Sequence, residues 1–120
     1  MATKDTIEAY LAAWNEADEA KRAAILDRCW SAAGTYTDPL ADVSGREALA
    51  QTVSAFHKQM PGASIALASG IDEHHGRIRF AWKVVTKEGT SPMEGIDIGQ
   101  LDADGRLASI VGFWGSPPAA

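Results

Sequence analysis

The stretch Met93-Glu-Gly-Ile-Asp-Ile-Gly-Gln-Leu101 decides the fold, because it alternates like a β-strand and carries a carboxylate at its centre. Successive side chains of a strand point to opposite faces of a sheet. One face therefore holds Met93, Gly95, Asp97, Gly99 and Leu101, and the other holds Ile96 and Ile98. The two glycines leave open space beside Asp97, and an unpaired buried carboxylate is costly. We therefore expect this strand to form the wall of a cavity and its back to be buried as well.

Four segments with a strand-like period of two follow residue 62 and are separated by turns. The apolar residues of the first two segments are Ile65, Leu67 and Ile71, and then Ile78, Phe80, Trp82 and Val84. The third segment is residues 93–101, and the fourth runs from Arg106 to about Gly115. The turns cover residues 73–76, 88–92 and 102–105. This order predicts an antiparallel meander of four strands.

Three helices are predicted ahead of the meander. The first covers residues 5–16, with Asp5 and Glu8 in capping-box spacing and an apolar stripe of Ile7, Tyr10, Leu11 and Trp14. Asp18 caps a second helix that ends near Trp30. The third starts at the capping box Ser44-Gly-Arg-Glu47 and stops at Pro61-Gly62. The predicted class is thus α+β, with three helices on a strongly curved, mostly antiparallel sheet.

A short strand over residues 35–38 is expected between the second and third helices, because Thr35-Tyr-Thr37 is β-branched and aromatic. Pro39 restricts the residue before it to an extended conformation. Asp38 is therefore expected at the end of a strand rather than on a helix.

The composition is that of one globular domain. We assign residues 1–116 of the 120 to it and residues 117–120 to a short tail. The net charge of −5 and the scattered Lys and Arg argue against a nucleic-acid partner. No apolar run reaches transmembrane length, and the N-terminus lacks the apolar core of a signal peptide. The single cysteine, Cys29, allows no intrachain disulfide, so we expect a cytoplasmic protein without membrane contact.

The last two strands are apolar on both faces, whereas three helices can cover only one face of a sheet. The face without helices carries Ile96, Ile98, Val111 and Phe113. Such a patch is exposed in a monomer. We therefore expect a homodimer that forms sheet to sheet.

Several strings along the chain resemble the nuclear transport factor 2-like superfamily, in particular its SnoaL-like polyketide cyclase and ketosteroid isomerase branch. They are Tyr10-Leu-Ala-Ala-Trp14-Asn-Glu-Ala-Asp18, Tyr36-Thr-Asp38-Pro39, Ser44-Gly45, Gly95-Ile-Asp97, and Asp104-Gly105-Arg106 through Gly112-Phe113-Trp114. Together they span nearly the whole chain. The resemblance implies a cone, in which three helices pack over a strongly bent sheet and a pocket opens between them.

The resemblance to ketosteroid isomerases also implies roles for three residues. It places the tyrosine of the first helix at Tyr10, the general base at Asp38 and a protonated Asp at Asp97. Taking a proton from a carbon beside a carbonyl requires a base on one side and donors for the enolate oxygen on the other. Burial in an apolar pocket would raise the pKa of Asp97 and keep it a donor. The implied substrate-binding residues are Trp14, Phe56, Met60, Phe80, Trp82, Met93, Gly95, Gly99, Ile110, Gly112 and Trp114.

Two functions remain open at this point. The first is a small enzyme without a cofactor, an isomerase or cyclase that acts on a hydrophobic carbonyl compound. The second is a dimeric module that binds a hydrophobic small molecule without converting it. The three residues have structural alternatives too: core packing for Tyr10, turn hydrogen bonds for Asp38, and a hydrogen bond to Tyr10 or Trp14 for Asp97.

The remaining polar candidates fit structural roles better. His74 and His75 fall in a turn and do not converge on a metal ion, so no metal site is expected. His57 follows Phe56 on the third helix and faces either solvent or the pocket. Cys29 suits packing. The Asp102-Ala-Asp-Gly105 turn lacks the distal Glu of a calcium loop, and Arg79 lies on the face opposite Trp82, which disfavours the Asp-Arg-Asp network of limonene-type epoxide hydrolases.

Overall fold

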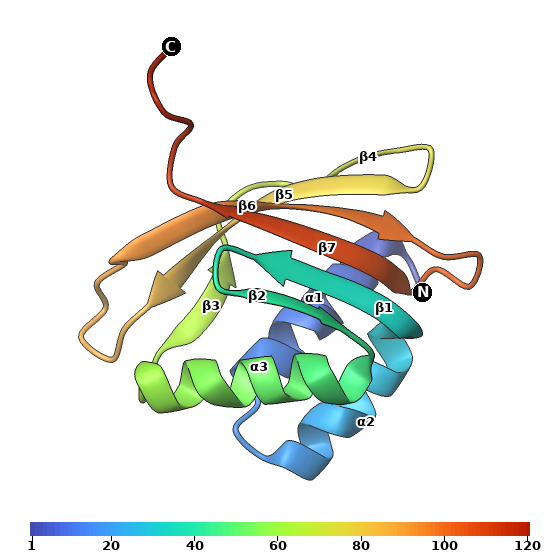
Figure 1. Ribbon diagram of the computed structural model, residues 1–120, viewed down its shortest axis with the longest axis horizontal. Helices are drawn as coiled ribbons and strands as arrows, with labels where there is room; N and C mark the ends of the chain where they lie inside the picture. The colour runs from blue at the N-terminus through green and yellow to red at the C-terminus, as the bar shows by residue number, and fades with distance from the viewer.

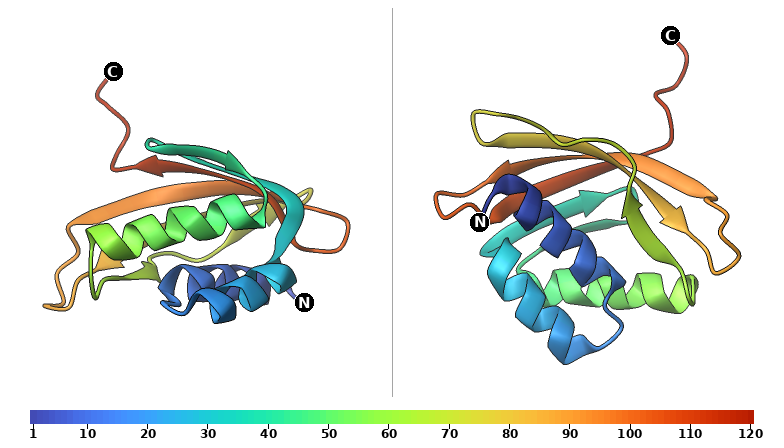
Figure 2. Two further views of the ribbon diagram at one scale, coloured as in Figure 1. Left: turned by 60° about the horizontal axis from the view of Figure 1, so that its bottom comes forward. Right: turned by 180° about the vertical axis from the view of Figure 1, so that it is seen from behind.

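The computed structural model describes residues 1–120 and contains three helices on one side of a curved sheet (Figures 1 and 2). The helices are α1 (Thr3–Asn15), α2 (Glu19–Cys29) and α3 (Arg46–Gln59). The strands are β1 (Trp30–Asp38), β2 (Ala41–Ser44), β3 (Ser64–Leu67), β4 (Asp72–His74), β5 (Arg77–Val85), β6 (Met93–Leu101) and β7 (Leu107–Trp114). This α+β architecture confirms the predicted fold class. None of the helices is both long and apolar enough to cross a membrane.

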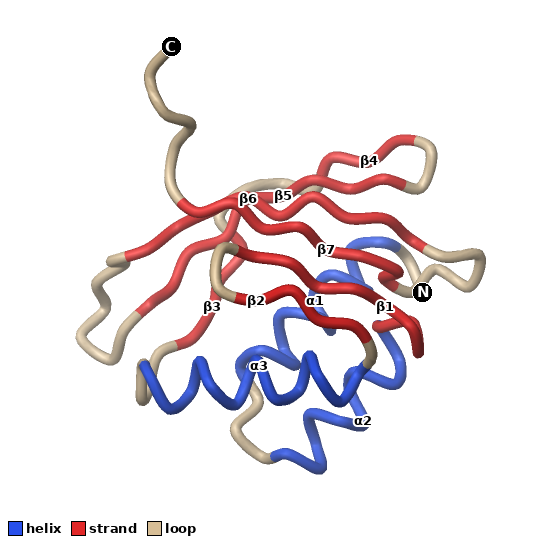
Figure 3. Tube along the Cα trace, in the orientation of Figure 1, coloured by secondary structure: helices blue, strands red, loops and turns tan.

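The strands form one mixed sheet in the order β2-β1-β7-β6-β5-β3, with β4 paired to β5 (Figure 3). All neighbours are antiparallel except β1 and β7, which are parallel. The antiparallel series β3-β5-β6-β7 matches the predicted meander of four strands. β2, the parallel pair and β4 were not predicted, and β4 takes up part of the turn expected over residues 73–76. β1 begins at Trp30 rather than residue 35, and its pairing with β7 is irregular between Trp30 and Thr35.

The side chains of β6 alternate between the two faces as expected, but the expected open space beside Asp97 is absent. Gly95 and Asp97 are buried on the inner face, while Ile98 on the other face is exposed. A Cβ on Gly95 would lie 2.5 Å from the Trp82 ring, and one on Gly99 would lie 2.8 Å from Ile110. The expectation that these glycines widen a cavity is therefore wrong. Their missing side chains make room for core residues instead.

The helix ends agree with the expected caps in one case of three. Asp18 accepts a hydrogen bond from the Lys21 amide at 2.9 Å and begins α2 as predicted. The residue before α3 is Gly45 rather than Ser44, and its φ of +89° suits a glycine. Ser44 pairs with Thr35 as the end of β2, so it makes no capping box. α1 already starts at Thr3, which places Asp5 in its first turn.

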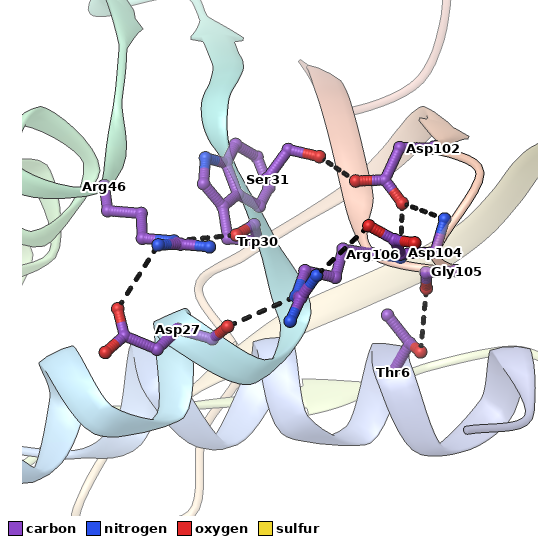
Figure 4. Close-up of polar contacts among 9 residues, drawn as sticks. All are labelled: Thr6, Asp27, Trp30, Ser31, Arg46, Asp102, Asp104, Gly105 and Arg106. Carbon is purple, nitrogen blue, oxygen red and sulfur yellow. Dashed lines mark hydrogen bonds and ion pairs between the residues drawn. The ribbon is translucent and has the colours of Figure 1, made fainter.

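Polar contacts fasten the β6–β7 turn to the helices at one end of the sheet (Figure 4). Asp102 accepts hydrogen bonds from the backbone amides of Asp104 and Arg106 and from the Ser31 hydroxyl. The Thr6 hydroxyl of α1 donates to the Gly105 carbonyl at 3.2 Å, and Arg106 Nε donates to the Asp27 carbonyl of α2 at 3.2 Å. The segment from Asp102 to Gly105 is thus a structural turn.

The face of the sheet away from the helices carries the predicted apolar patch. Ile96 pairs with Phe113 across β6 and β7, and Ile98 pairs with Val111, so the four side chains adjoin. Phe113 is 60% exposed, and Ile98 and Val111 are exposed as well. Ile96 is half-buried, and no helix covers this face of β6 (Figure 2).

Candidate functional site

A cavity of about 690 Å³ lies between the helices and the inner face of the sheet. α1 contributes Tyr10, Leu11 and Trp14, and α3 contributes residues between Ala48 and Gln59, followed by Met60. β1, β5, β6 and β7 contribute Tyr36, Asp38, Trp82, Val84, Met93, Asp97 and Trp114. The segment from Leu40 to Val43, which includes β2, and Ile65 of β3 complete the lining. Most lining residues are hydrophobic, as in typical small-molecule sites.

Asp97 is the buried carboxyl group of this cavity. It stands in the middle of β6 and is 6% exposed. Its Oδ1 accepts a hydrogen bond from Trp82 Nε1 at 2.9 Å, so the structural partner is neither Tyr10 nor Trp14. Burial raises the pKa of Asp97 to about 7, which the Trp82 hydrogen bond opposes and the charge of Asp38 reinforces. Both the acid and the ionised form of Asp97 are therefore populated near neutral pH.

Asp38 lies at the end of β1 and is held by three donors. Its Oδ1 accepts from the backbone amides of Leu40 and Ala41, both at 2.8 Å. Its Oδ2 accepts from the Tyr36 hydroxyl at 2.6 Å. Tyr36 is buried, and its pKa is raised by burial and by the adjacent Asp38. This set of donors suits an ionised carboxylate, which only accepts hydrogen bonds.

Gly112 allows the two carboxyl groups to approach one another. It pairs with Asp97 across β6 and β7, and Asp38 follows the parallel pair of Thr37 and Val111. A Cβ on Gly112 would lie 2.9 Å from Asp97 Oδ1 and 3.7 Å from Asp38 Cβ. Asp38 and Asp97 thus flank one glycine and line one cavity.

Tyr10 lines the same cavity from α1. It is almost fully buried and stacks on Trp30, with ring centroids 5.6 Å apart and planes 15° apart. Burial, followed by the charge of Asp97, raises the pKa of Tyr10 well above its ordinary value, so its hydroxyl stays protonated. Tyr10 thus belongs both to the core and to the lining of the cavity.

The predicted substrate-binding residues divide into two groups. The cavity is lined by Trp14, Phe56, Met60, Trp82, Met93 and Trp114. It is not lined by Phe80, Gly95, Gly99, Ile110 and Gly112. Phe80 and Ile110 are buried in the core, and the three glycines are covered by Trp82, Ile110 and Asp97.

Several parts of the site were missed from the sequence, among them the lining from Leu40 to Val43. Tyr36 stands two residues before Asp38 on the same strand face, so the period of two was the signal that could have revealed it. The polar lining residues of α3, Gln51, Thr52 and Gln59, were also missed, although Phe56 of the same helix was predicted. These polar residues gave no signal, because they fall on the solvent side of an ordinary amphipathic pattern.

The other polar candidates lie outside the cavity. His57 Nε2 is 2.8 Å from the Trp14 carbonyl and links α3 to α1. His74 and His75 are exposed near the β4–β5 turn. Arg79 is exposed and pairs with Asp72 at 2.6 Å, so it is not part of an Asp-Arg-Asp network. Cys29 is buried, and burial raises its pKa to about 11, which keeps it a thiol.

Comparisons with known proteins agree on one family. The sequence matches the SnoaL-like domain over residues 7–110. A proposed isomerase of the SnoaL-like family from Agrobacterium tumefaciens is similar over 97% of this chain and 100% of that chain, with 31% identity and a TM-score of 0.90. A proposed polyketide cyclase from Sinorhizobium meliloti shares the fold, with 16% identity, a TM-score of 0.70, and coverage of 90% of this chain and 93% of that chain.

A protein of unknown function with a cystatin-like fold from Methylobium petroleophilum also shares the fold. Its identity is 22% and its TM-score is 0.77, over 98% of this chain and 78% of that chain. No curated protein sequence matches significantly.

Proposed function

Because the chain belongs to the SnoaL-like family and has the nuclear transport factor 2-like fold, we propose that it is a small proton-transfer enzyme. Its substrate is a hydrophobic carbonyl compound, and its reaction is an isomerisation or a cyclisation. Both reactions begin with removal of a proton from a carbon beside a carbonyl group.

The observation that carries this proposal is the placement of Asp97. A carboxyl group buried in an apolar cavity, with a pKa of about 7, can give or take a proton at neutral pH. A second carboxyl group, Asp38, lies beside it across Gly112. Perturbed titratable groups that converge in a cavity are typical of catalytic sites.

The roles follow from the hydrogen bonds of each group. Asp38 is the base, because the Leu40 and Ala41 amides and the Tyr36 hydroxyl fix a carboxylate there and leave acceptor capacity on Oδ2. The acid form of Asp97 donates to the developing enolate oxygen, and the buried Tyr10 hydroxyl assists it. The surrounding aromatic side chains exclude water and hold the apolar part of the substrate.

The test is exchange of carbon-bound hydrogen with solvent, which needs no knowledge of the natural substrate. A cyclic ketone such as 2-tetralone is incubated with the protein in deuterated buffer, and deuterium uptake beside the carbonyl is followed by NMR. We expect the wild type to accelerate uptake over buffer, and Asp38→Asn, which removes the proposed base, to reduce the acceleration by about a hundredfold, as for other acid–base residues.

The matched control is Asp72→Asn, which removes an exposed carboxylate of β4 that is paired with Arg79. It should exchange at the wild-type rate. If the wild type binds the ketone but exchanges it no faster than buffer, the chain is a binding module for hydrophobic molecules and the enzyme proposal is wrong.

A further inference from the structure

The charged residues that line the cavity are all acidic. Its lining includes Asp38, Asp42 and Asp97, but no Lys, Arg or His, although the chain has eleven Lys and Arg and three His. The carboxylate of Asp42 accepts a hydrogen bond from the Thr37 hydroxyl at 3.0 Å on the outer face of β1 and β2, so only Asp38 and Asp97 direct their carboxyl groups inward. A ligand that enters therefore meets carboxyl groups without any cation to offset them.

The charge at Asp38 is fixed in place. Two backbone amides and the Tyr36 hydroxyl bind both of its oxygens, and β1 positions its backbone. An anion placed in the cavity would lie close to this carboxylate in a region of low polarity, where charges interact more strongly than in water. Like charges brought together in a site oppose binding.

The aromatic lining acts in the same direction. Trp14 packs against Tyr36 with ring centroids 5.5 Å apart and against Phe56 at 5.8 Å, and all three rings line the cavity. The faces of aromatic rings attract cations, and ammonium ions are often bound between several such rings. Tyr36 brings this aromatic cluster into contact with Asp38.

From these contacts we infer that the cavity selects its ligand by charge: it takes hydrophobic molecules that are neutral or, preferably, carry a protonated amine, and it excludes carboxylates, phosphates and sulfates. This inference rests on the proposed function only in taking the cavity as the substrate site. It narrows the substrate class to hydrophobic carbonyl compounds without an acidic group, with those that also contain a basic nitrogen bound most tightly.

The inference is tested with three compounds that share one ring system. Binding of 2-naphthylmethylamine, 2-naphthalenemethanol and 2-naphthoate is measured by calorimetry at low ionic strength. We expect the amine to bind at least threefold more tightly than the alcohol, and the alcohol about tenfold more tightly than the carboxylate. That factor corresponds to a unit charge a few ångströms away at a partly solvated site.

The variant Asp38→Asn tests whether the preference for the amine arises in the cavity. An Asn can accept the Leu40 and Ala41 amides through its Oδ1, so the turn should be kept, and the ratio of amine to carboxylate affinity should fall about tenfold. Asp72→Asn changes the net charge of the protein equally but lies on exposed β4, and it should preserve the ratio.

Equal affinities for the three compounds, or tighter binding of the carboxylate, would overturn the inference. So would an equal fall of the ratio in both variants, because it would trace the selection to net charge alone. The proton-transfer proposal is judged separately by deuterium uptake, so charge selection without exchange would leave this inference standing.

Discussion

Burial of the Asp97 carboxyl couples the stability of the fold to pH. Its pKa is about 7 in the folded chain, against 3.8 for an ordinary Asp, so the folded state holds this proton more tightly than the unfolded state. The stability due to this proton is complete below about pH 4 and is lost as the pH rises to about 7. Above pH 7 the Asp97 carboxylate is a buried charge that destabilises the folded chain.

Asp97→Asn should remove this dependence. An Asn can still accept the Trp82 hydrogen bond through its Oδ1 and has no charge to bury. Relative to wild type, its free energy of unfolding should change little at pH 4 and increase by up to about 4 kcal/mol at pH 8. Urea unfolding at the two pH values measures both. The same difference between variant and wild type at pH 4 and at pH 8 would contradict this account of Asp97.

At single positions, the site residues that could be predicted from the sequence are polar residues that stand out from their surroundings. Asp97 inside an apolar strand and Asp38 before a proline were such residues, and the structure places both in one cavity. The partner of Asp97 was not identified, because the bond from Trp82 depends on how β5 and β6 pair, with Phe80 opposite Asp97. No local pattern contains that register.

At the scale of helices and strands, periodicity predicted those elements in which apolar residues recur at regular spacing. α1, α3 and β5 to β7 belong to this class. β2 was missed because Ala41-Asp-Val-Ser44 is too short to show an alternation. The first half of β1 was missed because Ser31-Ala-Ala-Gly34 contains no β-branched residue. β2 is a strand because it pairs with Thr35 to Asp38 of β1. The first half of β1 is anchored by Trp30, which pairs with Leu107 of β7 from a distant part of the chain.

Arg22 shows how α2 is attached to the rest of the domain. Its side chain is 2% exposed, donates through Nε and Nη2 to the Glu16 carbonyl, and donates through Nη1 to the Ala50 carbonyl and to Ser54 Oγ. It therefore joins the α1–α2 connection to α3. The apolar residues of α2 did not indicate this role, because Arg22 is charged and the next residue, Ala23, is exposed.

Arg22→Met should destabilise the domain, because it fills much of the same volume but leaves the Glu16 and Ala50 carbonyls without their donor. We expect the free energy of unfolding to fall by about 3 kcal/mol, the effect of losing hydrogen bonds from a buried charged group. Urea unfolding measures it. Lys21→Met is the control, since this neighbouring side chain is exposed and carries the same charge. A similar small loss in both variants would mean that Arg22 contributes little.

For the molecule as a whole, β6 separates the cavity from the outer surface of the sheet. Its inner face carries Asp97, and its outer face carries Ile96 and Ile98. The helices cover only the inner face of the sheet (Figure 2). A second chain placed against the outer face would thus support the strand that positions Asp97, without entering the cavity.

We expect two chains to associate through the outer patch of Ile96, Ile98, Val111 and Phe113, because a contiguous exposed apolar surface is typical of an interface. Sedimentation equilibrium of the wild type at micromolar concentration should give twice the monomer mass of 12.7 kDa. Phe113→Asp places a charge in the centre of the patch and should give the monomer, whereas Ala12→Asp on the exposed side of α1 should remain a dimer. A wild type of monomer mass would show that this face stays open to solvent, and the support for β6 would then come from its own sheet alone.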